Sequence, residues 1–259
     1  TSRILVWDLP VRLFHWMLAI SFAGAWVTAD SERWRDIHIL LGYTAGGLVA
    51  LRVVWGLVGT RHARFASFVR GPRRVIAYLR SLVSDRPEHA TGHNPAGAWA
   101  IVALLLLTLA IVATGLVVEA DAGPKNLDDV HEALATAMLV VVGIHVAGVV
   151  LGSLVHRENL VRAMITGRKL GAPGEAIGSP RRLVAVALVA LVVGVWTGVL
   201  PAPGLPALVA EALQGGLGRL PVPVELGERA LSFPPGEAVQ EVHVRRGVEQ
   251  PLRLLLPVQ

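Results

Sequence analysis

Four histidines of this chain lie inside or at the start of long apolar segments, and their spacing suggests metal chemistry. His131 and His145 share one such segment, residues 128–156. An α-helix turns about 100° and rises about 1.5 Å per residue, so fourteen residues bring the second imidazole back to nearly the same face, roughly 21 Å further along the axis. Ionisable side chains inside a membrane are costly and usually functional. One imidazole near each edge of the hydrocarbon core could supply an axial ligand to each of two haems.

Composition places these histidines in a membrane protein. Of the 259 residues, 53% are hydrophobic and only 17% are charged, and the mean hydropathy is +0.57. The chain has no cysteine, which excludes disulfides, iron–sulfur clusters, thiolate zinc sites and covalent c-type haem. Any haem would therefore be held by side-chain ligands and packing alone.

Five apolar segments are long enough to be considered as membrane spans, and we expect an all-α membrane protein. The first segment lacks a convincing cleavage site and is expected to remain as a signal anchor. Asn94 and Pro95 are typical of the cap and first turn of the third span. The fifth segment has no histidine and no charge, as expected of an anchor. The predicted spans are residues 11–29, 37–59, 96–118, 128–156 and 183–200.

Arginine placement predicts the orientation. Residues 60–96 hold seven arginines against Asp85 and Glu88, and the segment after the fourth span is also basic. Basic loops mark the cytoplasmic side, so the N-terminus is expected in the cytoplasm. Five spans then put residues 201–259 in the bacterial periplasm, where alternating runs predict a few strands. Residues 73–83 alternate basic and apolar positions, as in an interfacial helix on anionic headgroups.

This orientation sorts the four histidines by depth. His15 and His145 fall in the cytoplasmic half of the membrane, and His38 and His131 fall in the periplasmic half. Each pair joins a different helix to the fourth span, as bis-imidazole ligation of two haems requires. A single histidine near a helix end is more often interfacial, so the matched depths carry the prediction. The remaining histidines lie in loops or at polar ends, where we expect them to be solvated: His62, His89, His93, His156 and His243.

Two further residues of the second span are candidates for cofactor binding. Arg52 lies fourteen residues after His38, at a depth where its guanidinium could pair with a haem propionate; the alternative is snorkelling to the cytoplasmic surface. Gly42, with Gly46 and Gly47, leaves one flank of the helix bare. Such a flank admits either a porphyrin plane or a neighbouring helix.

The chain resembles the bacterial cytochrome b561 family, which includes the cytochrome b subunits of nickel–iron hydrogenases. The resemblance covers about residues 4–170. It rests on VWDLPVRLFHW, GHNPAGA, the four histidines in order and the closing R-x-M-x-x-G. It implies a four-helix core with two non-covalent b haems on His15, His38, His131 and His145. It also implies electron exchange with quinone and often a periplasmic partner such as a c-type cytochrome.

These observations predict three parts and one function. We expect a four-helix dihaem cytochrome b domain at 1–170, a linker and fifth membrane helix at 171–200, and a periplasmic segment at 201–259. The expected function is electron transfer across the bacterial inner membrane between the quinone pool, ubiquinone or menaquinone, and a periplasmic c-type cytochrome. Alternatives are a subunit of a hydrogenase or other dehydrogenase, and a superoxide:quinone oxidoreductase. A histidine-lined transporter without haem and a purely structural anchor are alternatives of a different class.

Overall fold

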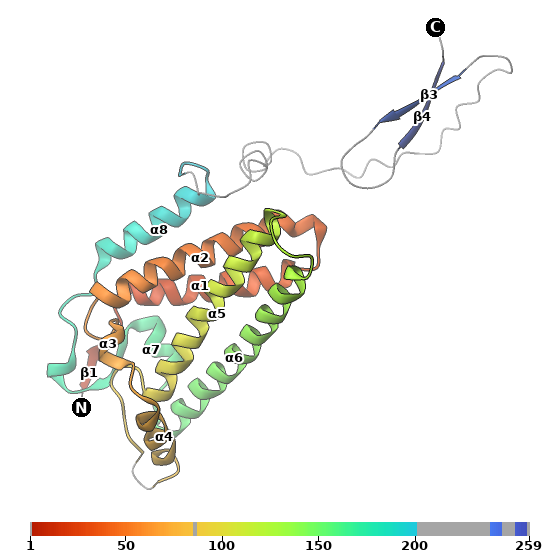
Figure 1. Ribbon diagram of the computed structural model, residues 1–259. Coiled ribbons are helices and arrows are strands. Elements are labelled where there is room, and N and C mark those ends of the chain that lie inside the picture. Colours follow the sequence, from red (N-terminus) through yellow and green to blue (C-terminus); the bar gives the residue numbers. More distant parts are fainter. Residues whose placement is uncertain (1, 85–86, 201–238, 245–251, 258–259) are drawn as a thin grey trace. The chain divides into compact units, whose positions relative to one another are not determined.

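Four long helices dominate the computed structural model, which describes residues 2–84, 87–200, 239–244 and 252–257. With 20 to 29 residues each and apolar composition, all four are long enough to cross a membrane. They lie side by side (Figure 1). The helices predicted for the first four spans are therefore confirmed within a few residues, as candidate spans. The four helices are α1 Leu9–Thr28, α2 Arg35–Val58, α5 Pro95–Glu119 and α6 Leu127–Val155.

The outer faces of these helices are apolar, which fits a bundle surrounded by lipid. Ile20 is 68% exposed, Leu106 is 61% exposed and Val140 is 58% exposed. In water an apolar surface of this extent would be a strong liability. Tight packing is found inside, where α1 contacts α2 and α5 contacts α6 along much of their lengths.

Local sequence explains where two of the helices begin. Asp8 caps α1 by accepting a hydrogen bond from the Val11 amide at 2.9 Å, and Pro10 follows in the first turn. Asn94 caps α5 in the same manner, accepting from the Gly97 amide at 2.7 Å. Both capping side chains accept a hydrogen bond from a backbone N–H group that the first turn of a helix leaves without a partner. The predicted cap of the third span is thereby confirmed.

Shorter elements gather at one end of the bundle, where the chain begins and where α2 and α6 end (Figure 1). The opening residues form a strand that pairs antiparallel with a strand far along the chain, with Ser2 opposite Gly171 and Leu5 opposite Arg168. This pairing was not predicted, because the lead-in reads locally as a short amphipathic segment. The elements are β1 Ser2–Leu5, α3 Phe65–Phe68, α4 Pro72–Ser81, α7 Leu160–Thr166, β2 Arg168–Gly171 and the 3₁₀ turn Pro173–Glu175. A second 3₁₀ turn, Glu32–Trp34, lies between α1 and α2.

The helix α8, Arg182–Trp196, lies within the predicted fifth span but has only 15 residues. At about 1.5 Å per residue it is roughly 22 Å long, shorter than a typical hydrocarbon core. It packs on α1, and Trp196 Nε1 donates a 2.9 Å hydrogen bond to Thr44 Oγ1 of α2. A fifth membrane span at 183–200 stays a prediction.

The C-terminal strands predicted from alternating runs are present. β3, Val239–Val244, pairs antiparallel with β4, Leu252–Pro257. They belong to a compact unit separate from the helices. Residues 205–213, whose apolar sequence favours a short helix, lie outside the described residues.

Candidate functional site

The helices bring the four predicted histidines together in two pairs. His15 of α1 faces His145 of α6, with ring centroids 6.5 Å apart. His38 of α2 faces His131 of α6, with ring centroids 6.2 Å apart. We call these the first pair and the second pair. The pairing is the one predicted from depth, and α6 contributes one ring to each pair.

The ring separations fit one metal ion between each two imidazoles. An imidazole nitrogen binds a transition metal at about 2 Å and lies just over 1 Å from its own ring centroid, so two imidazoles on opposite sides of one iron have centroids about 6.3 Å apart. Both observed separations agree with this value. Stacked or directly hydrogen-bonded rings would lie closer. The donor set therefore fits a bis-imidazole iron, while ligation itself remains a prediction.

The second pair has hydrogen-bond partners that orient both rings. His38 Nδ1 lies 2.8 Å from the backbone carbonyl of Ala25, and His131 Nδ1 lies 3.0 Å from Thr114 Oγ1. The Thr114 hydroxyl is also within 3.0 Å of the Ala110 and Ile111 carbonyls, to which it donates. Each Nδ1 thus carries the proton and donates it, which leaves Nε2 with the lone pair that a metal needs.

Glycines shape the space around the second pair. A Cβ on Gly115 of α5 would lie 3.0 Å from His131 Cε1, so glycine allows the ring to approach that helix. A Cβ on Gly46 would lie 2.9 Å from Val112, which assigns Gly46 to helix packing. A Cβ on Gly42 or on Gly47 would meet nothing within 4 Å. The bare flank predicted for α2 is therefore divided between a helix contact and open space.

Arg52 is buried against α1 and does not extend to the surface, as snorkelling would require. Its side chain is 3% exposed, and Nη2 donates to the Ala63 carbonyl at 3.1 Å. The guanidinium lies 4.9 Å from the ring centre of Phe65 and 5.9 Å from that of Phe14. Its Nη1 is buried and has no hydrogen-bond partner within the described part of the chain.

His93 contradicts the expectation that the remaining histidines are solvated. Its ring lies between Trp7 and Phe68, at centroid distances of 4.4 Å and 4.5 Å, and its Nδ1 is buried without a partner among the residues described. Burial is the main reason that its pKa falls well below the ordinary value, with the charges of Arg52 and Lys169 adding to the effect. The cause of the wrong prediction is tertiary: Trp7 covers a loop that is 86 residues away in the sequence.

The other four histidines differ in their surroundings. His62 Nε2 lies 2.8 Å from the Glu175 carbonyl, so it too is held by the fold rather than fully solvated. His89 and His156 pair at 5.5 Å between ring centroids beside Glu158, and His89 is exposed as predicted. His243 lies on β3, where side chains are outside the described part of the structure.

Asp8 is a buried polar residue that sequence reasoning missed. It is 1% exposed, and besides capping α1 it accepts hydrogen bonds from Trp55 Nε1 at 3.1 Å and from Thr60 Oγ1 at 2.6 Å. The carboxylate therefore connects the start of α1 with the end of α2. The available signal was the Asp-x-Pro at the start of the first apolar segment, which is typical of a helix cap.

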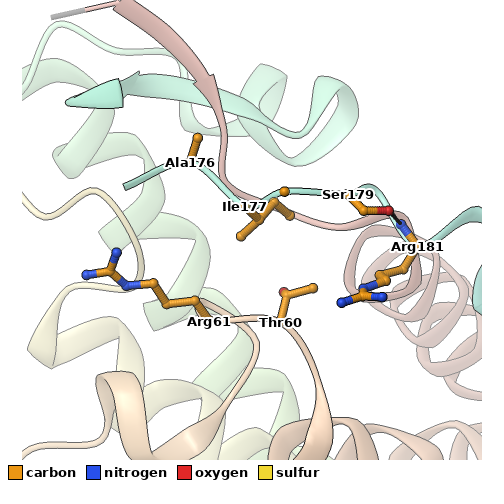
Figure 2. A pocket seen from close by; sticks show the side chains of 7 residues that line it. Thr60, Arg61, Ala176, Ile177, Ser179 and Arg181 are labelled. Atoms are coloured by element: carbon orange, nitrogen blue, oxygen red, sulfur yellow. Dashed lines mark hydrogen bonds between the residues drawn. The ribbon is translucent and has the colours of Figure 1, made fainter. Parts of the chain in front are cut away.

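Two surface pockets lie away from the histidines. The smaller, of about 220 Å³, is lined by residues 60–61 and by residues from 176–181. Figure 2 shows Ile177 between Arg61 and Arg181, and a hydrogen bond of 3.2 Å from the Arg181 amide to Ser179 Oγ. The second, of about 620 Å³, is lined by residues 179–184. Neither pocket is lined by any of the four paired histidines.

Fold and site together define a multi-pass membrane protein whose paired histidines fit haem iron. The family model described as prokaryotic cytochrome b561 matches residues 6–167, and the chain belongs to that family. Membership of this family implies that the chain binds b-type haem and takes part in electron transport.

The chain is also similar to proteins that are named as probable hydrogenase cytochrome subunits. The chain is 25% identical over 216 residues to a probable Ni/Fe-hydrogenase B-type cytochrome subunit of Rhizobium leguminosarum bv. viciae, covering 65% of this chain and 90% of the relative. The subunit of that name from Azotobacter vinelandii is 25% identical over 217 residues, covering 65% and 89%. The one from Cupriavidus necator is 24% identical over 207 residues, covering 62% and 85%. No solved structure gives a significant match to the chain.

Proposed function

We propose that this chain transfers electrons across the bacterial inner membrane and holds two b-type haems, one on the first pair and one on the second. The observation that carries the proposal is the ring separation of 6.5 Å in one pair and 6.2 Å in the other. Both agree with two imidazoles on one iron, and the two pairs occupy positions fourteen residues apart on α6. Two sites of this kind at different depths along one helix are suited to moving charge through a low-dielectric layer.

The chain's own residues have separate tasks in this proposal. When bound, a b-type haem supplies one-electron oxidation and reduction. The four paired imidazoles would hold the two irons and set their reduction potentials. His15 and His145 would hold one iron, and His38 and His131 the other. Ala25 and Thr114 orient the second pair through the Nδ1 protons. Arg52 offers a buried positive charge near the first pair, and Gly42 leaves room along α2. Apolar side chains of the bundle exclude water.

The basic loops support an orientation with the N-terminus in the cytoplasm. The first pair then lies toward the cytoplasm and the second toward the periplasm. In this orientation the chain exchanges electrons between a membrane quinone and a redox partner at the periplasmic face. With a fifth span at 183–200, residues 201–259 would lie on the partner's side and could dock it.

A hydrogenase or another dehydrogenase is the partner that the relatives favour. The relatives named above carry the name of a Ni/Fe-hydrogenase subunit and are covered over 85–90% of their length. A c-type cytochrome is the second candidate for the same surface. Isolation in mild detergent with the partner identified by mass spectrometry separates the two candidates.

Electron transfer across sealed vesicles tests the proposal. The purified chain is reconstituted in quinone-free liposomes that contain ascorbate, with ferricyanide outside. We expect ferricyanide reduction at a rate that depends on the chain and falls at least tenfold in His38→Ala and in His145→Ala. Vesicles with His89→Gln, an exposed histidine outside both pairs, serve as the control. Equal rates in all vesicles, or a chain that purifies without haem, would exclude the proposal and leave the transporter and anchor alternatives.

A further inference from the structure

The end of the bundle that holds the first pair contains buried nitrogen atoms without partners. Within the described ranges, the buried side-chain nitrogens or oxygens that lack a hydrogen bond belong to Arg12, His15, Arg52 and His93. The second pair differs, because both of its Nδ1 atoms have partners. A buried polar atom without a partner costs free energy. An acceptor-rich group is therefore expected at this end of the bundle.

Arg52 and His93 are joined by one aromatic cluster. Trp7 and Phe68 enclose the His93 ring, Phe68 lies 5.8 Å from Phe65, and the Arg52 guanidinium lies 4.9 Å from Phe65. The Arg52 guanidinium also lies 5.9 Å from the ring centre of Phe14, the residue before His15 of the first pair. Arg52 of α2 and His93 of the loop before α5 are thus two hydrogen-bond donors in one aromatic cluster, which also reaches α1 at Phe14.

The Arg52 guanidinium lacks a carboxylate partner within the described ranges of the chain. Among the described residues no acidic side chain forms an ion pair with Arg52. Asp8 is the nearest candidate by charge, but its two oxygens already accept from Val11, Trp55 and Thr60. A buried guanidinium without an anion is strongly unfavourable. The described part of the chain therefore leaves a place for an anion beside Arg52.

We propose that His93 and Arg52 together bind a propionate carboxylate of the haem on the first pair, with His93 donating from Nδ1 and Arg52 from Nη1. The inference rests on the proposed function and adds His93 as a cofactor-binding residue. A carboxylate can accept both hydrogen bonds at once, and its charge would balance Arg52. A neutral quinone would leave the guanidinium without a counter-charge, so the geometry favours the propionate.

The test measures the midpoint potentials of the two haems in the purified holoprotein by spectroscopic redox titration. A propionate that loses a donor or a positive charge makes the iron easier to oxidise. We expect His93→Leu and Arg52→Gln each to lower the midpoint potential of the same haem. The midpoint potential of the other haem should stay unchanged in both variants. The double variant should shift that haem by less than the sum of the single shifts, because both residues hold one group.

His62→Leu is the matched control. His62 is also within reach of Trp7, at 6.4 Å between ring centroids, but its Nε2 already bonds the Glu175 carbonyl. It should leave both potentials unchanged. His93→Gln keeps an N–H donor and should give a smaller shift of the same haem, which preserves the test if His93→Leu does not accumulate. Resonance Raman spectra should show a changed propionate bending mode in His93→Leu.

The failure of this inference is distinguishable from the failure of the proposed function. A wild-type chain without two haems would contradict the proposed function. Two haems whose potentials are unchanged in both His93 variants would overturn the inference alone. Equal shifts of both haems, or a shift of the same size in His62→Leu, would also overturn it, because they would indicate general loosening of the fold.

Discussion

Thr114 of α5 and His131 of α6 are hydrogen-bonded across the contact between their helices, with Oγ1 3.0 Å from Nδ1. The threonine hydroxyl proton is directed to its own helix, at the Ala110 and Ile111 carbonyls. Its oxygen is therefore free to accept the imidazole N–H. This contact fixes both the orientation and the tautomer of one proposed ligand, and partners of this kind affect a metal site strongly.

Replacing Thr114 with valine should retain both haems and raise the potential of the haem on the second pair. Without an acceptor for Nδ1–H, the imidazole donates less electron density to ferric iron. A hydrogen bond of about 1 kcal/mol corresponds to roughly 40 mV for one electron. Redox titration measures the shift. Thr108→Val is the control, because that hydroxyl bonds the Leu104 carbonyl on the same helix; equal shifts in the two variants would contradict the proposed role.

Gly42→Leu should remove one haem without unfolding the bundle. A Cβ at Gly42 meets no protein atom within 4 Å, so the polypeptide alone tolerates a side chain there. A porphyrin along this flank of α2 would not. The measurements are haem content per chain and helical circular dichroism. Gly71→Leu, at an equally open position that begins α4, is the matched control. Full haem content in Gly42→Leu would exclude a porphyrin at this flank.

Gly167→Ala should destabilise the end of the bundle where β1 pairs with β2. Gly167 has φ +79°, and a Cβ would lie 2.7 Å from the Trp7 carbonyl oxygen. Its own carbonyl accepts hydrogen bonds from the Val6 and Trp7 amides. Strain of this kind costs about 1–3 kcal/mol, so the temperature at which the haem absorbance is lost should fall by several degrees. Gly174→Ala has open space around it and should melt like the wild type.

Stability should fall on the acid side of neutrality, in part through His156 at the end of α6. Burial lowers the pKa of His156 below 6.5, the charges of His89 and Lys169 lower it further, and Glu158 opposes them. Between the lowered pKa and 6.5 the unfolded chain binds more protons than the folded chain, so acidification through this interval favours unfolding. Melting temperatures at pH 7 and pH 5 measure the loss. It should be smaller in His156→Gln, and an identical loss would contradict this assignment.

Local sequence was sufficient to predict the helices and the pairing of the four histidines. Apolar length predicted the four long helices, and Asn94 predicted the start of α5. The fourteen-residue interval between His131 and His145 predicted that α6 would contribute one ring to each pair. These features depend on helical geometry, which is a property of neighbouring residues.

Contacts between distant segments could not be predicted. Ser2 pairs with Gly171 through backbone atoms, which carry no sequence signal of their own. His93 appears polar in its loop, and only Trp7 and Phe68 make it buried. The hydrogen bonds that the Asp8 carboxylate accepts from Trp55 and Thr60 likewise depend on how α1 packs against α2.

Haem quantitation tests the central claim most directly. A pyridine haemochrome assay with a reduced-minus-oxidised spectrum should give two b haems per purified chain. His145→Ala and His38→Ala should each lose one haem, and a different one, because each breaks one pair. A chain without a Soret band, or one whose haem content survives both substitutions, would contradict the assignment of the two pairs as haem ligands.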